Sequence, residues 1–412
     1  MTHENSASSF GPDFVLDVDD PAFVKNPYPT YRWLRESAPA YAWASRRAVI
    51  FSRYKDVKAI LTDRRFSNDY RQWEFFQGDA AWPPEHLEYK QIMDNGLFGL
   101  NDADHARVRK LVSVAFTPRS AERMRGEIQR TVDTILDKTV VDGRLNIRDF
   151  SEQLPITVIG DMLKIPVELR AEFRAFGIAA IRTVTLNNDP VAFFTAIAPM
   201  PRWLKMLRDV IEDRRKGLLD NDLLSTLIAA RDEGAKLSEL EMIALIQALL
   251  IAGSDTTVHA TNFAIHALLR HPEALAELRA DRSLLRNTIE ESLRYDLFGK
   301  AGVGRFPKED VELGGVHLHK GQMAIPLIPA ALHDPEVFPE PERFDIHRDL
   351  SQTIAFGAGQ HFCLGANLAR LEIEIAVGTL IDRYPAMKLL AGPVFEPNPI
   401  MRSVARLDVA LH

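Results

Sequence analysis

The only cysteine of the chain lies in a segment whose residue types could hold a metal ion. Residues 356–365 read Phe-Gly-Ala-Gly-Gln-His-Phe-Cys-Leu-Gly, and residues 366–372 have the pattern of a helix start. Cys363 is therefore expected at a helix N-terminus, where unpaired N–H groups and the helix dipole favour a thiolate. Gly357 and Gly359 permit a tight turn whose amides could approach the sulfur. A thiolate is the form of cysteine that binds metals.

Two other interpretations fit the cysteine segment. A free cysteine is commonly a small buried apolar residue, and Cys363 taken alone favours that interpretation. The glycines also begin a G-x-G-x-x-G string of the nucleotide-binding type, but Phe362 occupies the third glycine position and the match fails.

A second group of reactive residues stands within an apolar helical pattern. Ser238 and Glu241 have the spacing of a capping box, and the pattern continues to Pro272. This predicts a helix of about 32 residues, roughly 48 Å long. Residues 242–251 are apolar nearly all round, which predicts that the middle of this helix is buried.

The buried middle of this helix is interrupted by small and polar residues. Residues 252–257 read Ala-Gly-Ser-Asp-Thr-Thr, a run that helix propensity disfavours. Asp255 and Thr256, side by side, could relay protons through ordered water. A kink in which serine and threonine bond back to preceding carbonyls explains the same residues, and spacing does not decide between the two.

Further polar residues have helical spacings that suit an anion or an ion pair. His105 and Arg109 are four apart, so two donors share one helical face, although a solvated basic face is the ordinary explanation. Arg305 alone would be a surface arginine near a turn. Glu291 and Arg294 are three apart, which alone predicts an exposed ion pair worth about 0.2–0.5 kcal/mol.

The cysteine segment resembles the haem-binding loop of cytochromes P450, Phe-Gly-x-Gly-x-His-x-Cys-x-Gly, with every fixed position filled. This resemblance implies that Cys363 ligates the iron of haem b and that His361 contacts a haem propionate. In such proteins the thiolate favours cleavage of the O–O bond. Phe356, Gly357 and Ala252 are expected to contact the haem as well.

Other segments resemble the same family in the same order. Residues 252–257 are similar to its oxygen-activation motif, which implies that Asp255 and Thr256 are catalytic and relay protons toward dioxygen. The resemblance also implies propionate contacts for a further set of residues, namely His105, Arg109 and Arg305. Glu291 and Arg294 match the Glu-x-x-Arg signature, with Arg343 as the third member of a structural triad. One departure is His333, which stands where many bacterial members carry arginine and puts local packing or partner contacts in doubt.

The elements that position these residues are mostly helices. Helical spacing occurs at 108–116, 124–136 and 284–293, and a β-like run occurs at 48–51. Residues 1–30, 71–101 and 299–329 are expected to be irregular or to form small sheets. We therefore expect a mainly α chain with small β-sheets, the cytochrome P450 fold, as a single domain over residues 1–412 with a long central helix and disorder over residues 1–12.

Composition excludes several classes of protein. The net charge of -7 would repel a nucleic acid, and one cysteine permits no intrachain disulfide. The N-terminus lacks a signal-peptide pattern, and the apolar stretch at 242–253 is shorter than the roughly 18 residues that span a bilayer. We expect a cytoplasmic, soluble protein with no nucleic-acid or membrane partner, and a monomer.

The resemblance also implies partners. No dinucleotide or flavin fingerprint is present, so electrons must come from outside the chain, by family likeness from a ferredoxin and its reductase. Lys110 and Arg119 are candidate basic contacts for this donor. The expected pocket is apolar, which leaves terpenoids, steroids, fatty acids and macrolides open as substrates. Its expected lining is Phe98, Ala248, Ile251, Val303, Ile400 and Met401.

The function that these features predict is that of a haem-thiolate monooxygenase, which inserts one atom of O2 into an apolar substrate. Two alternatives stay open: a haem-thiolate peroxygenase or isomerase that needs no electron donor, and a haem sensor without catalysis. The acid and threonine of the central helix favour the first function.

Overall fold

The computed structural model describes residues 10–11, 14–76, 82–100, 102–183, 190–217, 222–232, 237–398 and 400–412. Most of the segment expected to be disordered, residues 1–12, lies outside this description. Phe10 lies inside it, and its ring stacks on Trp33 with centroids 5.6 Å apart.

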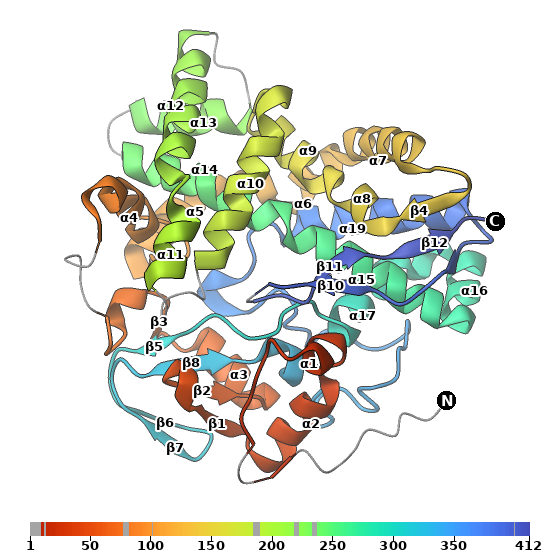
Figure 1. Ribbon diagram of the computed structural model, residues 1–412, viewed down its shortest axis with the longest axis horizontal. Coiled ribbons are helices and arrows are strands. Elements are labelled where there is room, and N and C mark those ends of the chain that lie inside the picture. Colours follow the sequence, from red (N-terminus) through yellow and green to blue (C-terminus); the bar gives the residue numbers. More distant parts are fainter. Residues whose placement is uncertain are drawn as a thin grey trace.

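Helices make up most of the described chain and form the larger, upper part of the molecule in Figure 1. The α-helices are α1 (Pro21–Lys25), α2 (Tyr28–Ser37), α3 (Tyr54–Thr62), α4 (Leu87–Asp94), α5 (Asp102–Ser113), α6 (Pro118–Arg123), α7 (Arg125–Thr139), α8 (Ile147–Ser151), α9 (Gln153–Met162), α10 (Val167–Thr183), α11 (Pro190–Ile197), α12 (Met200–Lys216), α13 (Leu223–Asp232), α14 (Glu239–Ser254), α15 (Thr256–Arg270), α16 (Pro272–Ala280), α17 (Leu285–Tyr295), α18 (Ile328–Ala331) and α19 (Ala366–Arg383). Short 3-10 turns are η1 (Ala44–Arg46), η2 (Tyr70–Gln72), η4 (Pro84–His86), η5 (Val114–Phe116), η6 (Arg282–Leu284) and η7 (Gly359–His361).

The strands are short and form small separate sheets. They are β1 (Ala40–Trp43), β2 (Ala48–Phe51), β3 (Phe66–Ser67), β4 (Arg144–Asn146), β5 (Phe306–Pro307), β6 (Val311–Leu313), β7 (Val316–Leu318), β8 (Met323–Pro326), β9 (Lys388–Leu389), β10 (Val394–Glu396), β11 (Ser403–Arg406) and β12 (Asp408–Ala410). In the sheet β1-β2-β8, β2 and β8 run parallel with Ile50 opposite Ile325. This sheet lies at the lower end of Figure 1, beside α2 and α3.

The central helix begins and ends where the sequence predicts. Ser238 and Glu241 form the capping box, and α15 ends at Arg270, one residue before His271 and Pro272. The helix is nevertheless interrupted, because Asp255 separates α14 from α15 with φ -108° and ψ -31°. The small and polar residues 252–257 thus interrupt a helix that is otherwise continuous.

The central helix tests the expectation that no segment of the chain is long and apolar enough to cross a membrane. By length and composition the 32 residues Glu239–Arg270 could cross a membrane, so the expectation that the apolar stretch is too short was wrong. In the described part of the chain, however, 76% of its most apolar window is buried inside the protein. An apolar helix covered by other helices is a core helix.

The expected secondary structure is largely confirmed. The predicted helices correspond to α5 with η5, α7 and α17, and the predicted strand at 48–51 is β2. Residues 299–329 contain β5 to β8. Two expectations were wrong, since residues 1–30 contain α1 and residues 71–101 contain α4. In both places prolines stand at or next to the first helical turn, where they are tolerated, rather than inside the helix.

Candidate active site

The cysteine segment forms a tight loop between Ile354 and the start of α19. Gly357 has φ +75° and Gly359 φ +70°, the left-handed conformation that glycine adopts without strain. The N–H of Gly357 donates to the Ile354 carbonyl at 2.8 Å, and the N–H of Cys363 donates to the Phe356 carbonyl at 2.9 Å. A Cβ on Gly359 would lie 2.4 Å from the Leu61 carbonyl oxygen, so α3 packs directly on this loop.

The Cys363 thiol is exposed, yet protein encloses it on several sides. Burial raises the pKa of the thiol above its usual value. The N–H groups of Gly365 and Ala366 and the guanidinium groups of Arg109 and Arg370 lower this pKa, but by less than burial raises it. The N–H groups at the start of α19 thus favour the thiolate, as the sequence predicts, but burial opposes them. The amides that reach the sulfur belong to Gly365 and Ala366, not to the turn glycines.

Two imidazoles from distant parts of the chain meet beside this loop. The rings of His105, in α5, and His361 have centroids 4.1 Å apart. The Nε2 atoms of both are buried and have no hydrogen-bond partner among the described residues. Burial, with the Arg109 charge, lowers the pKa of His105 to about 4, and burial with neighbouring cationic groups lowers that of His361 to about 3. Two neutral imidazoles thus lack an acceptor.

Two arginines complete this group. Arg109 donates from Nη2 to the Phe362 carbonyl at 2.6 Å, which ties α5 to the cysteine loop. Arg305 exchanges backbone hydrogen bonds with Ala324 in β8, and its Nη1 donates to the nearby Val303 and Gly304 carbonyls. Burial lowers the pKa of Arg305 to about 10, and no carboxylate in the described part of the chain pairs with it. The two imidazoles and two arginines of this group present N–H donors, and none of the four is acidic.

The interruption of the central helix carries a buried carboxylate. Asp255 is 4% exposed, its Oδ1 lies 3.6 Å from Nη1 of Arg148, and its Oδ2 lies 3.5 Å from Nε2 of His259. Burial raises the pKa of Asp255, but His259, Arg148 and Arg174 together hold it below its usual value. The carboxylate is therefore ionised although it lies inside the protein.

The residues around Asp255 differ in exposure. Thr256 donates from Oγ1 to the Ala252 carbonyl at 2.8 Å, the back-bond that the kink interpretation predicts. Ala252 itself is exposed, whereas residues 242–250 of the same helix are all buried. An exposed alanine in a buried helix marks the place where a bound group can approach the helix.

Comparison with known proteins decides what this arrangement is. The family model for cytochrome P450 matches residues 36–389. The chain belongs to the cytochrome P450 family. It is 40% identical to the epothilone C/D epoxidase of Sorangium cellulosum, over 100% of this chain and 99% of that protein. It is 36% identical to the cytochrome P450 monooxygenase PikC of Streptomyces venezuelae, over 94% of this chain and 91% of that protein.

Solved structures agree with the fold of this P450. The crystal structure of epothilone D-bound cytochrome P450epoK superposes with a TM-score of 0.91 at 40% identity, covering 97% of this chain and 99% of that chain. The mainly α fold with small sheets is thereby confirmed. This P450 is a monooxygenase whose cofactor is haem b, as the sequence predicts.

The residues of this P450 fit a haem. A haem brings an iron that takes a thiolate ligand and two propionates that accept hydrogen bonds. The exposed sulfur of Cys363 offers the ligand, and the unpartnered Nε2 atoms of His105 and His361 offer donors to carboxylates. Arg305, which pairs with no acid in the described part of the chain, would gain one. Each of these four groups is of the kind that haem satisfies.

The expected substrate-pocket residues fall into two groups. Phe98 and Val303 are 61% and 58% exposed, and Ile251 and Ile400 are half-buried. Ala248 and Met401 are buried in the protein, at 6% and 4% exposure. The first four side chains are at least partly open to solvent, whereas those of Ala248 and Met401 are covered by the protein.

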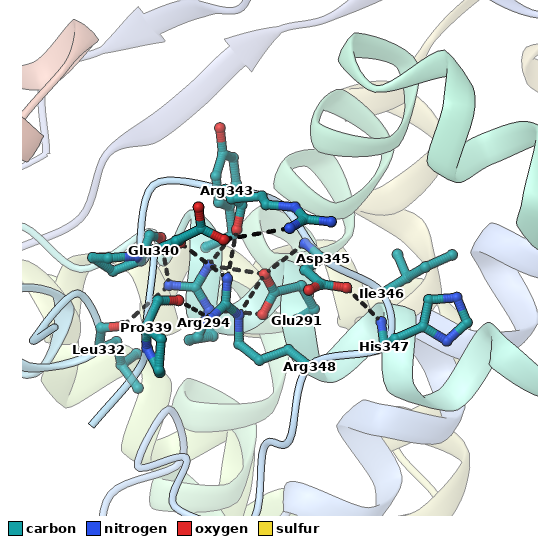
Figure 2. Close-up of polar contacts among 12 residues, drawn as sticks. Glu291, Arg294, Leu332, Pro339, Glu340, Arg343, Asp345, Ile346, His347 and Arg348 are labelled. Carbon is teal, nitrogen blue, oxygen red and sulfur yellow. Dashed lines mark hydrogen bonds and ion pairs between the residues drawn. The ribbon is translucent and has the colours of Figure 1, made fainter. Parts of the chain in front are cut away.

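The ion-pair triad contains a different arginine from the one expected. Arg294 pairs with Glu291 through Nε at 2.7 Å, and both side chains are 0% exposed, so the exposed pair predicted from spacing alone was wrong. The third member is Arg348, whose Nε lies 3.2 Å from Glu291 Oε1. The Arg343 side chain pairs instead with exposed Glu340, and only its carbonyl accepts from Arg294 and Arg348 (Figure 2).

His333 lies in the core, 4% exposed, and its Nε2 donates to the Tyr295 carbonyl at 3.0 Å. Its ring centroid is 4.4 Å from that of Tyr28. It therefore affects local packing and does not contact a partner. Lys110 and Arg119, the candidate docking residues, are both exposed, on α5 and α6.

Several residues near the site were missed by sequence reasoning. Arg148 and His259 contact Asp255. Gln247 is buried, its Nε2 donates to Tyr89 at 3.3 Å, and its Oε1 has no partner among the residues that the structure describes. His259 could have been found, since it stands four residues after Asp255 on a helix. Arg148 comes from a distant segment and gives no local signal.

Proposed function

We propose that Cys363 is the iron ligand of this P450 and that His105, Arg109, Arg305 and His361 hold the haem propionates. The observation that carries this proposal is the exposed thiol beside two imidazoles whose buried Nε2 atoms have no hydrogen-bond partner among the described residues. The bound haem supplies an iron centre that activates O2, with the thiolate ligand favouring O–O cleavage. Phe356, Gly357 and Ala252 complete the contact surface.

Asp255 and Thr256 supply protons to the reaction in this proposal. Asp255 is ionised and buried, so it accepts a proton from its surroundings and passes it on without opening the site to bulk water. The Thr256 hydroxyl donates to the Ala252 carbonyl, which leaves its oxygen free to accept a hydrogen bond.

The substrate is proposed to be a bulky, mainly apolar molecule of polyketide type. Relatives are named for epothilone, for 6-deoxyerythronolide B and for polyketide biosynthesis, at 40%, 33% and 31% identity. The exposed apolar side chains Phe98 and Val303, with half-buried Ile251 and Ile400, supply the contact surface for such a molecule, and the buried Ala248 and Met401 support it.

Electrons are proposed to come from a ferredoxin and its reductase, docking beside Cys363 on a surface that includes Lys110 and Arg119. Arg109, next to Lys110 in α5, contacts the cysteine loop directly, so this surface is close to the ligand. We also propose that residues 1–412 form one domain and that the protein acts as a monomer in the cytoplasm.

The test is the absorption spectrum of the reduced, CO-bound holoenzyme, because a thiolate ligand gives a strongly red-shifted Soret band. The wild type and Asp255→Asn are expected to show this band, whereas Cys363→Ser is expected to lose it. Retention of the band in Cys363→Ser would refute the ligand assignment. Turnover with peroxide, but none with ferredoxin and O2, would favour a peroxygenase instead.

A further inference from the structure

A groove on the helical part of the molecule has no role in the function proposed above. It has a volume of about 870 Å³ and lies between α7, α9 and α13, bordered also by α5, η5 and α6. α7 and α9 lie side by side in the upper part of Figure 1. The described lining of the groove includes none of the residues proposed for haem, proton delivery or substrate. Its volume is typical of a small-molecule site, roughly 300–1,000 Å³.

The charged side chains of α7 are divided between two faces. Asp133 and Asp137 lie 3.5 and 2.6 Å from the guanidinium group of Arg383 in α19. Arg130 and Lys138 line the groove instead, and neither pairs with a carboxylate among the described residues. α7 therefore presents two of its acids to α19 and two cations to the groove.

Two further cations line the groove from other elements. Arg123 belongs to α6 and Lys164 to the turn after α9, and neither forms an ion pair in the described part of the chain. Glu127 of α7 is also in the lining and has no ion pair there either. Among the described residues, four unpaired cations thus line the groove together with one unpaired carboxylate.

The other two carboxylates in the described lining are paired with arginines. Asp161 lies 2.6 Å from Nη2 of Arg170, and Asp222 pairs with Arg214 and accepts from the N–H of Ser225 at 2.8 Å. The groove thus has a positive excess, although the chain as a whole carries a net charge of -7. A local excess of one sign attracts ligands of the opposite charge.

Apolar side chains form the deeper part of the groove. Ile135 and Leu223 are 5% and 8% exposed. Leu111, Met124 and Met162 are half-buried, and all five belong to the lining. The four unpaired cations, in contrast, are exposed. The groove therefore combines an apolar floor with a cationic rim, which is complementary to a molecule with an apolar body and an anionic head group.

We propose that this groove binds a small amphipathic carboxylate, with its hydrocarbon chain on the apolar floor and its carboxylate at the cationic rim. A concave site of this volume favours a small molecule over the broad face of a protein. The proposal does not rest on the roles proposed for Cys363, Asp255 or the electron donor.

The first experiment measures binding of decanoate to the haem-loaded protein by isothermal titration calorimetry. An excess of 4-phenylimidazole is present, because its nitrogen binds the haem iron and its rings occupy the adjoining pocket. Decanoate is expected to bind with an affinity that falls as ionic strength rises, since the contacts at the rim are exposed ion pairs. Absence of binding would refute the proposal.

Two double variants locate the site. Arg130→Gln with Lys138→Gln removes the rim cations of α7, and Arg123→Gln with Lys164→Gln removes the other two. All four side chains are exposed and lack ion pairs in the described part of the chain, so the fold should tolerate both changes. At least one double variant is expected to bind decanoate about tenfold more weakly than the wild type. Unchanged affinity in both would place the decanoate elsewhere and overturn the proposal.

The matched control is Lys320→Gln with Lys388→Gln. It removes two positive charges from exposed lysines that do not line the groove. The control is expected to bind decanoate as the wild type does. A loss equal to that of the groove variants would show a general effect of net charge and count against a site in the groove.

The length of the hydrocarbon chain tests the apolar floor. Each buried CH₂ group is expected to tighten binding about fourfold, so decanoate should bind about 15-fold more tightly than octanoate. Decan-1-ol keeps the chain but lacks the charge, and it should bind the wild type about tenfold more weakly than decanoate. Equal affinities for octanoate and decanoate would mean ion pairing at the surface without a site for the chain.

The electron donor is the alternative occupant, because Lys110 and Arg119 are next in sequence to the groove residues Leu111 and Ser120. We expect ferredoxin to reduce the groove variants as fast as the wild type. Slower reduction of these variants, together with no decanoate binding by the wild type, would assign the groove to the donor and overturn the proposal. The CO-bound spectrum tests Cys363 and does not depend on the groove, so the two proposals can fail separately.

Discussion

Arg348 Nε lies 3.2 Å from Oε1 of Glu291, in a part of the core where Glu291 is 0% exposed. The same oxygen accepts from Arg294 Nη2 at 2.8 Å and from the N–H of Asp345 at 2.9 Å (Figure 2). A buried carboxylate with this many charged and polar donors is fully satisfied, and loss of one charged donor leaves part of its charge uncompensated. Arg348 also donates to the carbonyls of the surrounding loop.

The first prediction compares the two arginines of this region. Arg348→Ala is expected to lower the free energy of unfolding by about 3 kcal/mol, the low end of the cost of breaking a buried ion pair. Arg343→Ala removes only an exposed pair with Glu340 and is expected to change it by less than about 0.5 kcal/mol. Chemical denaturation of both variants measures the difference, and equal effects would contradict the assignment of Arg348.

The second prediction concerns the two glycines of the cysteine loop. Both have positive φ, but a Cβ on Gly359 would lie 2.4 Å from the Leu61 oxygen, whereas one on Gly357 meets nothing closer than 3.9 Å. Gly357→Ala is therefore expected to cost about 1–2 kcal/mol of backbone strain alone. Gly359→Ala must displace α3 or the loop, and we expect it to lose haem as well. The ratio of Soret to protein absorbance reports this, and similar haem content in the two variants would count against the packing argument.

The third prediction concerns Glu372 in α19, which is 3% exposed, with its Oε2 unpartnered in the described part of the chain. Burial raises the pKa of its carboxyl to about 8. The pKa of this carboxyl is higher in the folded than in the unfolded protein. Protonated Glu372 therefore contributes its full share to the free energy of unfolding below the unfolded pKa, near 4.5, and this share is lost as pH rises through 8. Between these values the loss is about 1.4 kcal/mol per pH unit at most.

Glu372→Gln removes this titration and keeps the shape of the side chain. We expect the difference in unfolding free energy between Glu372→Gln and wild type to move in favour of the variant as pH rises from 5 to 8. Urea unfolding at several pH values measures it. Asp382→Asn, an exposed substitution near the end of the same helix, serves as the control and should show no such trend. A constant difference for Glu372→Gln would mean that the carboxyl ionises normally.

The fourth prediction tests the electron-donor surface. Lys110→Glu with Arg119→Glu is expected to slow reduction of the haem by ferredoxin and to weaken its dependence on ionic strength, because exposed charges at such an interface mainly affect the association rate. Lys388→Glu, an exposed substitution in β9, is the control for charge reversal elsewhere on the surface. An unchanged rate and unchanged salt dependence in the double variant would exclude this surface. Reduction with dithionite should be the same in all three proteins.

The sequence predicted those features that depend on local pattern. The capping box of Ser238, the helix end before Pro272 and the tight glycine turn of the cysteine loop were all predicted because each is determined by a few neighbouring residues. The break at Asp255 was also expected, since small polar residues disfavour helix. Placement of α1 and α4 failed because local proline content does not say whether a proline precedes or interrupts a helix.

By itself the sequence determined which reactive groups this P450 carries: one thiol in a glycine turn, one acid beside a threonine, and the imidazoles and arginines that we propose for the propionates. The tertiary structure alone decided which residues surround them. In the folded chain Arg348, and not Arg343, pairs with Glu291, and Arg148 and His259 contact Asp255. At Cys363, burial raises the pKa of the thiol more than the N–H groups of the helix N-terminus lower it. The physical reason is that desolvation and long-range contacts depend on segments far apart in the chain, about which residue spacing carries no information.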